Sequence, residues 1–158
     1  MNILALPLTL YDSNYLYCLD SKPNLIMNGN FTKINYTHPH FTMNGLFFFV
    51  PITPTFVEQS SENTNFVHFD GGSLSNKSTL ECVVRIEHEL LSKYAGLNNS
   101  SKTVSYSMTK QFMKGKLKIN GDSVHSHTNS IVLKISGVWE NEIEYGITFR
   151  WIYAKLIN

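Results

Sequence analysis

The sequence predicts a β-rich α+β fold: a small barrel or curved antiparallel sheet with one long and one short helix, closed by a C-terminal β-hairpin. Three observations lead to this prediction. Apolar and polar residues alternate with the two-residue period of a strand over 131–136 and again over 145–154. A helical pattern of apolar residues occupies 78–96. The most apolar run, 41–52, is bounded by turn residues.

The first half of the chain predicts strands separated by turns. Residues 41–52 are too few for a membrane helix of about 20 residues, so this run predicts one buried central strand. In order, the expected elements are an N-terminal arm (1–24) ending in a turn at 20–24, a strand at 25–36 interrupted at 28–29, a turn at 37–40, the central strand at 41–52, a surface loop at 59–65 and a short strand at 66–69.

The clearest helix follows. Ser78 and Glu81 have the spacing of a capping box, and Gly96 stands where a left-handed C-cap is expected. Glu87 interrupts the apolar face of this helix. The apolar residues on that face are Leu80, Val83, Val84, Leu90, Leu91 and Tyr94. An amphipathic helix of this kind is expected to cover one side or one end of a sheet.

A short helix and further strands complete the predicted fold. Ser107 is expected to cap the short helix, which Gly115 ends. A strand over 116–119 and a tight turn from Asn120 lead to the terminal hairpin. This order of strands and helices predicts a single domain, 1–158. The simplest arrangement is a barrel with a helix between its third and fourth strands. This is the layout of an OB-fold.

Composition excludes several classes of protein. Aromatic residues make up 13% of the chain and charged residues only 16%, which is typical of a folded protein and not of a disordered one. The net charge of +1 gives no overall electrostatic attraction to nucleic acid. Cys18 and Cys82 are expected to be reduced thiols of an intracellular protein, with a single disulfide as the alternative. We expect no signal peptide and no secretion, because the N-terminus lacks a basic region and contains Pro7. We expect no membrane partner, because no apolar run approaches the length of about 20 residues that a membrane span needs.

Catalytic signatures are weak. His38 and His40 form one pair with two-residue spacing, and His125 and His127 form another, so four rings could in principle hold a divalent metal. Neither cluster contains an acid or a cysteine, and both lie in polar, turn-like sequence, so solvated histidines are the simpler interpretation. The sequence therefore predicts a protein that is not an enzyme, with no cofactor, no metal and no small-molecule substrate.

Charge distribution is more informative than net charge. No acidic residue occurs between Glu89 and Asp122, whereas lysine occurs six times. Lys110 and Lys114 are one helical turn apart, and Lys116 and Lys118 share one face of a strand. Lysines grouped in this way could bind a phosphate backbone, although a solvated face is the simpler reading of a lysine run alone.

Aromatic residues beside cations strengthen the nucleic-acid interpretation. Proteins that bind single strands combine a basic groove with exposed rings, each stacked base contributing about 1–3 kcal/mol. Tyr36 lies near Lys33, and Trp139 lies in a hairpin beside a polar turn. Arg150 is a permanent cation within an apolar strand, so it needs solvent, a carboxylate or a phosphate. Most other rings, including 47–49, are expected in the core.

Four stretches of the sequence resemble a known family. The terminal segments 133–140 and 144–150, together with 27–36 and 41–46, are similar to a small OB-fold-like protein family of large nucleo-cytoplasmic DNA viruses, relatives of the phage-type single-stranded-DNA-binding proteins. The resemblance implies single-stranded DNA binding in viral replication or repair, in the host cytoplasm or nucleus. Phage-type members usually end in an acidic tail that recruits replication partners, whereas residues 154–158 contain no acid.

The leading hypothesis is therefore a non-enzymatic protein that binds single-stranded nucleic acid and that could form homo-oligomers. The alternative is a viral structural or protein-interaction module, a virion or assembly component that oligomerises through strands and aromatic residues. The predicted nucleic-acid-binding residues are Lys33, Tyr36, Lys110, Lys114, Lys116, Lys118, Trp139 and Arg150.

Overall fold

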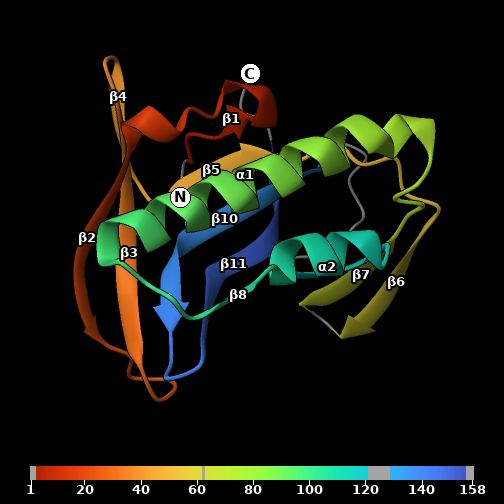
Figure 1. The fold of residues 1–158 in the computed structure, drawn as a ribbon. Helices are drawn as coiled ribbons and strands as arrows, with labels where there is room; N and C mark the ends of the chain where they lie inside the picture. The colour runs from red at the N-terminus through yellow and green to blue at the C-terminus, as the bar shows by residue number, and fades with distance from the viewer. Residues whose placement is uncertain (1–2, 62, 121–128, 156–158) are drawn as a thin grey trace.

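The computed structural model describes residues 3–61, 63–120 and 129–155, which form one strand-rich sheet with helices against it (Figure 1). The strands are β1 (Leu6–Pro7), β2 (Leu16–Pro23), β3 (Asn30–His38), β4 (Phe41–Asn44), β5 (Leu46–Phe49), β6 (Phe56–Ser61), β7 (Thr64–His68), β8 (Thr103–Ser105), β9 (Lys116–Asn120), β10 (Asn129–Glu140) and β11 (Glu144–Lys155). The helices are α1 (Leu74–Asn98) and α2 (Ser107–Met113), with short 3-10 turns at Leu8–Leu10 and Ser13–Tyr15.

The C-terminal hairpin is the centre of the sheet. β10 pairs with β11 in antiparallel fashion from Asn129 opposite Lys155 to Glu140 opposite Tyr145, as the alternating sequence predicts. The first half of β10 pairs with β5 and its second half with β3. The main strand order is β1-β5-β10-β11-β9-β7-β6, and β2 and β4 flank β3.

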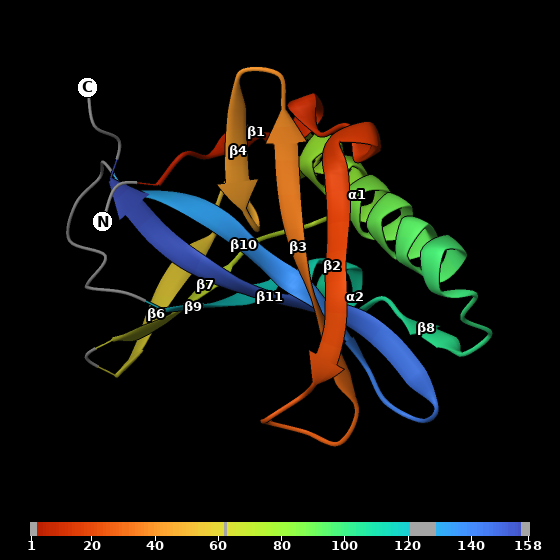
Figure 2. The same ribbon diagram turned by 90° about the vertical axis from the view of Figure 1, so that its left-hand side faces the viewer.

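The broad fold prediction is confirmed, and its finer form is not. The fold is α+β and strand-rich, with one long helix and one short helix. The sheet is not closed into a barrel. It is also not purely antiparallel, because β1 runs parallel to β5, and β8 and β9 run parallel to β11. In Figure 2 the sheet is strongly curved, and the β2–β3 loop and the β10–β11 turn lie at the same end of the molecule.

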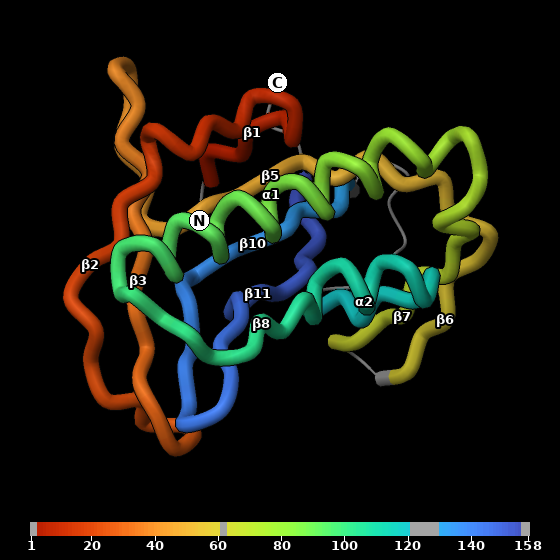
Figure 3. Tube along the Cα trace, in the orientation of Figure 1, coloured from red at the N-terminus to blue at the C-terminus, as the bar shows by residue number. Residues whose placement is uncertain are grey.

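Both helices cover one face of this sheet, and the core lies between the two layers. The trace in Figure 3 shows α1 crossing over β10, with α2 beside the β9 and β11 region. Leu90 of α1 and Phe112 of α2 are fully buried, as are Phe48 and Leu133 of the sheet. Trp151 of β11 is also 1% exposed, and its Nε1 donates a hydrogen bond of 2.7 Å to the side chain of Gln111 in α2. The opposite face of the sheet carries no helix among the described residues.

Helix α1 is longer than predicted at both ends. It begins at Leu74, not near Ser78, and ends at Asn98, where Asn99 takes the left-handed conformation (φ 48°) that was expected at Gly96. Asn76 in the first turn is buried, accepts a hydrogen bond from the backbone nitrogen of Thr53 and donates one to the carbonyl oxygen of Asp70. These tertiary hydrogen bonds hold a turn whose own sequence lacks apolar periodicity.

Glu87 is the polar residue that interrupts the apolar face of α1, and it is completely buried. Its Oε1 accepts a hydrogen bond of 2.9 Å from the backbone nitrogen of Met108, and its Oε2 accepts one of 2.7 Å from that of Thr109. A carboxylate in this position satisfies backbone donors in the first turn of α2 and interacts favourably with its dipole. Glu87, and not Ser107, therefore caps the short helix.

Three strand predictions were wrong. The run 41–52 forms two strands, β4 and β5, because Gly45 adopts a positive φ of 90° and leads the chain from one pairing partner to another. The segment 20–24 belongs largely to β2 and is not a turn. The segment 59–65 is mostly paired as the β6–β7 hairpin and is not a surface loop. The expected arm therefore contributes β1 and β2 to the sheet.

Candidate functional site

The candidate site is the face of the sheet that points away from the helices, which we call the open face. In β11, Ile147 and Trp151 are buried towards the helices, so Arg150 between them projects to the open face and is exposed. By the same alternation, Leu117 and Ile119 of β9 face the core. The cationic and aromatic residues on the open face include Phe31, Lys33, Phe47, Phe66, Lys116, Lys118, Lys134, Trp139 and Arg150.

A β-bulge places Trp139 on this face. The register of β10 against β11 shifts between Ile135 and Gly137, so Ser136 is an extra residue in the ladder. Strict alternation from Ile135 would turn Trp139 towards the core. After the bulge it is Val138 that is fully buried, and Trp139 is only half-buried. The bulge also marks the point where β10 changes its partner from β5 to β3.

Two glycines let aromatic rings pack closely against the backbone of the open face. Phe31 and Trp139 are opposite each other on β3 and β10. A Cβ atom at Gly137 would come within 2.7 Å of the Phe31 ring, and one at Gly146 within 2.8 Å of the Trp139 ring. Each ring therefore rests against bare backbone, which leaves its outer side available as a stacking platform.

One row of side chains crosses the middle of the open face, and we call it the cationic row. Lys134 of β10 lies directly opposite Phe47 of β5 on one side and Arg150 of β11 on the other. β9 pairs in parallel with β11 where Trp151 lies opposite Ile119, so Lys118 and Arg150, each one residue earlier in its strand, lie on the same face. In strand order the row is Phe47, Lys134, Arg150, Lys118 and Phe66.

The cations of this row repel one another, and none of them has an acidic partner among the described residues. Like charges directly opposite on neighbouring strands cost a few tenths of a kcal/mol up to about 1 kcal/mol. No carboxylate of the described residues forms an ion pair with Lys134, Arg150 or Lys118. The Lys134 Nζ lies 5.5 Å from the centre of the Phe47 ring, a cation–π contact that keeps the amine over this face. The row is therefore suited to a ligand that carries several negative charges.

At the far margin of the open face, beside β6, the positive charge of Lys116 is neutralised by the carboxylate of Glu58. Lys116 Nζ lies 4.4 Å from the centre of the Phe66 ring and 3.7 Å from the carboxylate of Glu58. His68 Nε2 lies 3.0 Å from the same carboxylate, and the ring of Phe56 stacks on His68. The hydrogen bond with His68 and the charge of Lys116 hold the pKa of Glu58 below its usual value. Lys116 is thus less available to a phosphate than the cations of the row.

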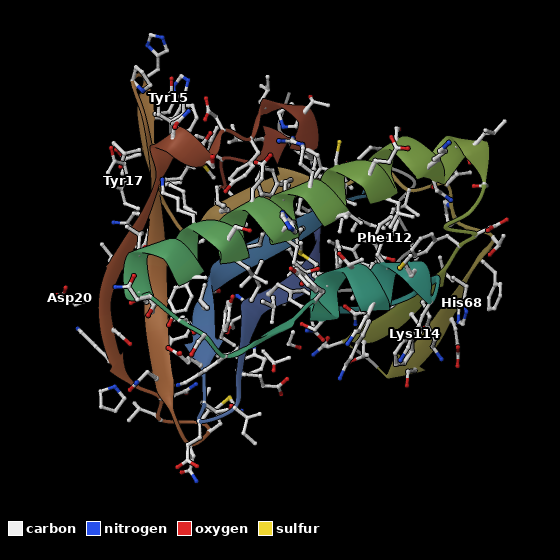
Figure 4. All side chains as sticks on the ribbon, in the orientation of Figure 1. Tyr15, Tyr17, Asp20, His68, Phe112 and Lys114 are labelled. Carbon is white, nitrogen blue, oxygen red and sulfur yellow. The ribbon has the colours of Figure 1, made fainter. Side chains whose placement is uncertain are left out.

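The structure brings together five of the eight predicted residues: Lys33, Lys116, Lys118, Trp139 and Arg150. Tyr36 was wrongly predicted as a stacking platform, because its ring is 1% exposed and its hydroxyl accepts a hydrogen bond from the backbone nitrogen of Asp12. Lys110 and Lys114 are exposed but belong to α2 and its C-cap, in the layer that covers the other face (Lys114 is labelled in Figure 4). They do not continue the row of Lys116 and Lys118.

Sequence reasoning missed Lys134, Phe47 and Phe66 as members of the site. Lys134 does carry a signal, since it alternates with Leu133 and Ile135 as Arg150 alternates with its apolar neighbours. Phe47 was assigned to the core because it lies in a run of three phenylalanines. The structure buries only Phe48 of these three completely, and Phe47 and Phe49 are half-buried.

Glu140 anchors the end of the hairpin to the helical layer. It accepts hydrogen bonds from the Tyr94 hydroxyl at 2.6 Å and from Ser100 Oγ at 3.3 Å, and Lys102 Nζ lies 3.1 Å away. Burial of this carboxyl group opposes ionisation, but the hydrogen bonds from Tyr94 and Lys102 outweigh it and lower the pKa of Glu140. Burial, and then the bond to Glu140, raise the pKa of Tyr94.

This anchor predicts a pH dependence of stability. Because the folded pKa of Glu140 lies below the ordinary value of 4.5, its contribution is complete above that pH and is lost as the pH falls through the folded pKa. Urea unfolding from neutral to acidic pH should show this loss in the wild type. The Glu140→Gln variant should be less stable at neutral pH and should approach the wild type in acid. A constant difference between the two at every pH would contradict this assignment.

The described residues contain no group of three or more His, Cys, Asp or Glu that could hold a metal ion. His38 and His40 lie near each other, where the Nδ1 of His38 accepts a hydrogen bond from the backbone nitrogen of His40. His125 and His127 lie outside the described residues.

Cys18 and Cys82 are both free thiols. Within the ranges that the structure describes, neither helix is both long and apolar enough to cross a membrane.

Compared with protein-family models, with curated proteins and with solved structures, the chain has no match.

Proposed function

We propose that this protein binds single-stranded nucleic acid on the open face of its sheet and is not an enzyme. Lys134, Arg150 and Lys118 would hold phosphates along the cationic row, with Lys33 beside them. Phe31 and Trp139 would stack on bases. Lys116 would contribute at the margin, in competition with Glu58.

The observation that carries this proposal is the cationic row itself. Three cations lie on the same face of neighbouring strands, Lys134 directly opposite Arg150, and none forms an ion pair with a carboxylate of the described residues, which is a cost to the fold. A solvated lysine face has no need of rings packed closely against glycine backbone, as Phe31 and Trp139 are. Cations beside exposed rings on a curved sheet are the combination that sequence-independent binders of single strands use.

The resemblance of 133–140 and 144–150 to a viral family supports the same function and suggests the biological process in which it acts. We propose an OB-like role in this sense: a curved sheet carries the strand on its open face, although the sheet is not closed. The corresponding biological role is protection of single strands during replication or repair of a large DNA virus, at its replication site in the host cell.

The salt dependence of binding tests the proposal. Fluorescence anisotropy of a labelled oligo-dT, titrated at low and moderate salt, should show binding that weakens as salt rises. With four to five phosphates contacted, the slope of log K against log salt should be about −3. Absence of binding at low salt would contradict the proposal.

A structural or assembly role is the second candidate, and one observation favours it. β6 is an edge strand whose residues 56–60 are all exposed, with Phe56 57% and Val57 37% accessible. Such an edge can pair with the edge of another copy. Elution from oligo-dT resin separates the two candidates. A strand-binding protein is retained and released by salt, whereas an assembly module flows through and elutes as an oligomer in size-exclusion chromatography.

A further inference from the structure

The open face ends in a pocket of about 950 Å³ beside the β2–β3 loop. Phe31 and Trp139 line it, together with Lys33 and Thr148 of the open face. Its other wall is β2 and the loop that follows, including Asp20, Lys22 and Leu25. Its volume lies within the range of clefts that enclose whole small molecules, about 300–1,000 Å³. The pocket is therefore large enough to take a nucleobase with its sugar.

The loop contributes apolar side chains that the fold does not bury. Leu25 is 100% exposed, Ile26 is 96% exposed and Met27 is 40% exposed, yet all three line the pocket. The loop is closed at its base, where the Asn24 nitrogen donates a hydrogen bond to the Gly29 carbonyl oxygen. Gly29 also approaches the Glu140 backbone too closely for any side chain. Exposed aliphatic groups on an anchored loop gain by covering a flat apolar ligand.

Asp20 gives the pocket a chemical preference. The register of β2 against β3 shifts between Cys18 and Ser21, and this irregularity contains Leu19 and Asp20. Asp20 is the one acidic residue that lines the pocket, and among the described residues no cation lies within ion-pair distance of its carboxylate. Lys22 and Lys33 line the same pocket. The site thus offers two flat rings, an acceptor-only carboxylate and two cations.

We propose that this pocket receives one base of the bound strand and prefers guanine. Guanine presents two adjacent donors, N1–H and the N2 amino group, which a carboxylate can accept together. Adenine offers a ring acceptor at the same position and would repel Asp20, whereas it stacks as well as guanine does. Lys22 and Lys33 would bind the flanking phosphates or the guanine O6. This inference rests on the proposed function and adds base selectivity to a binder otherwise indifferent to sequence.

The test is a competition experiment with four oligonucleotides. Each is an unlabelled oligo-dT, either unchanged or with one central thymine replaced by guanine, adenine or cytosine, competing for a labelled oligo-dT. The wild type should bind the guanine oligonucleotide about tenfold more tightly than the adenine one, since a good bidentate pair discriminates by that order. Comparison of guanine with adenine removes the contribution of purine stacking.

Asp20→Asn should reduce the guanine-to-adenine ratio to about one, because an amide cannot accept both donors. Glu142→Gln is the matched control: it removes the same charge from an exposed residue near the same end, outside the pocket, and should keep the ratio. Equal binding of all four oligonucleotides by the wild type would overturn the guanine preference and leave the proposed function standing. An unchanged ratio in Asp20→Asn would also overturn it. Binding of none of them would overturn both proposals.

Discussion

Replacement of Glu87 by alanine is expected to lower the free energy of unfolding by about 3 kcal/mol, the largest stability effect that we predict for a single polar residue. The carboxylate is fully buried and accepts hydrogen bonds from the backbone nitrogens of Met108 and Thr109. Its removal leaves both donors unsatisfied in the core and uncaps α2. Because α2 carries Gln111, the partner of Trp151, the loss should extend into the sheet. Urea denaturation followed by circular dichroism measures the change.

Glu89→Ala is the control for this prediction. Glu89 is two residues away on the same helix, but its side chain is 36% exposed and its partner is Arg85 in a surface ion pair. Removal of such a pair should change stability by about 0.5 kcal/mol or less. Glu87→Gln should fall between the two variants, since an amide oxygen still accepts one of the two hydrogen bonds. Equal free energies of unfolding for Glu87→Ala and Glu89→Ala would show that the hydrogen bonds from α2 to Glu87 do not stabilise the fold.

Reversal of charge at Lys134 and Arg150 together is expected to weaken binding of single strands by about 100-fold at low salt. Two phosphate contacts would be lost and two repulsive charges added at the centre of the cationic row. The slope of log K against log salt should become shallower by about 1.5. Two glutamates opposite each other repel as the two cations do, so the fold should be little affected. Anisotropy titrations of labelled oligo-dT over a salt series measure both quantities.

Charge reversal at Lys110 and Lys114 provides the matched comparison. This variant has the same change in net charge, but both residues belong to α2 and its C-cap, in the layer that covers the core face. Its affinity should fall only by the general electrostatic effect, about threefold. If the two double variants lost affinity equally, binding would depend on net charge alone, and the open face would have no special role.

Local sequence patterns were sufficient to predict the C-terminal hairpin but not to predict which residues form the site. The alternation over 131–136 and 145–154 predicted β10 and β11 and the outward position of Arg150. Strict alternation did not predict the side of the sheet on which Trp139 lies, because the bulge at Ser136 reverses it; Gly137 beside the bulge is the one local signal of that irregularity. Tyr36 looked like a platform because Lys33 is near in sequence. Strand geometry places the two residues on opposite faces, since they are three positions apart in one strand.

Tertiary contacts account for the other failures of prediction. Glu87 looked like an interruption of an amphipathic helix, because a sequence does not show that backbone donors of α2 will meet it in the core. The four lysines from Lys110 to Lys118 looked continuous. The chain passes from the helical layer into the sheet at Gly115, where φ is 67°, and this transition separates them into two pairs. Grouping residues by their distance in the sequence therefore joined four lysines that the structure separates. It also missed the cationic row, in which Lys134 has its partners on other strands.

The most direct test of the account is the intrinsic tryptophan fluorescence of the protein during titration with oligo-dT. The two tryptophans report on different layers, since Trp139 lines the pocket of the open face and Trp151 is 1% exposed against α2. We predict quenching that saturates together with anisotropy in the wild type and disappears in Trp139→Phe, in which the ring can still stack but does not report. Quenching that persists in Trp139→Phe, or saturable binding without any quenching in the wild type, would place the bound strand away from the open face and contradict the account.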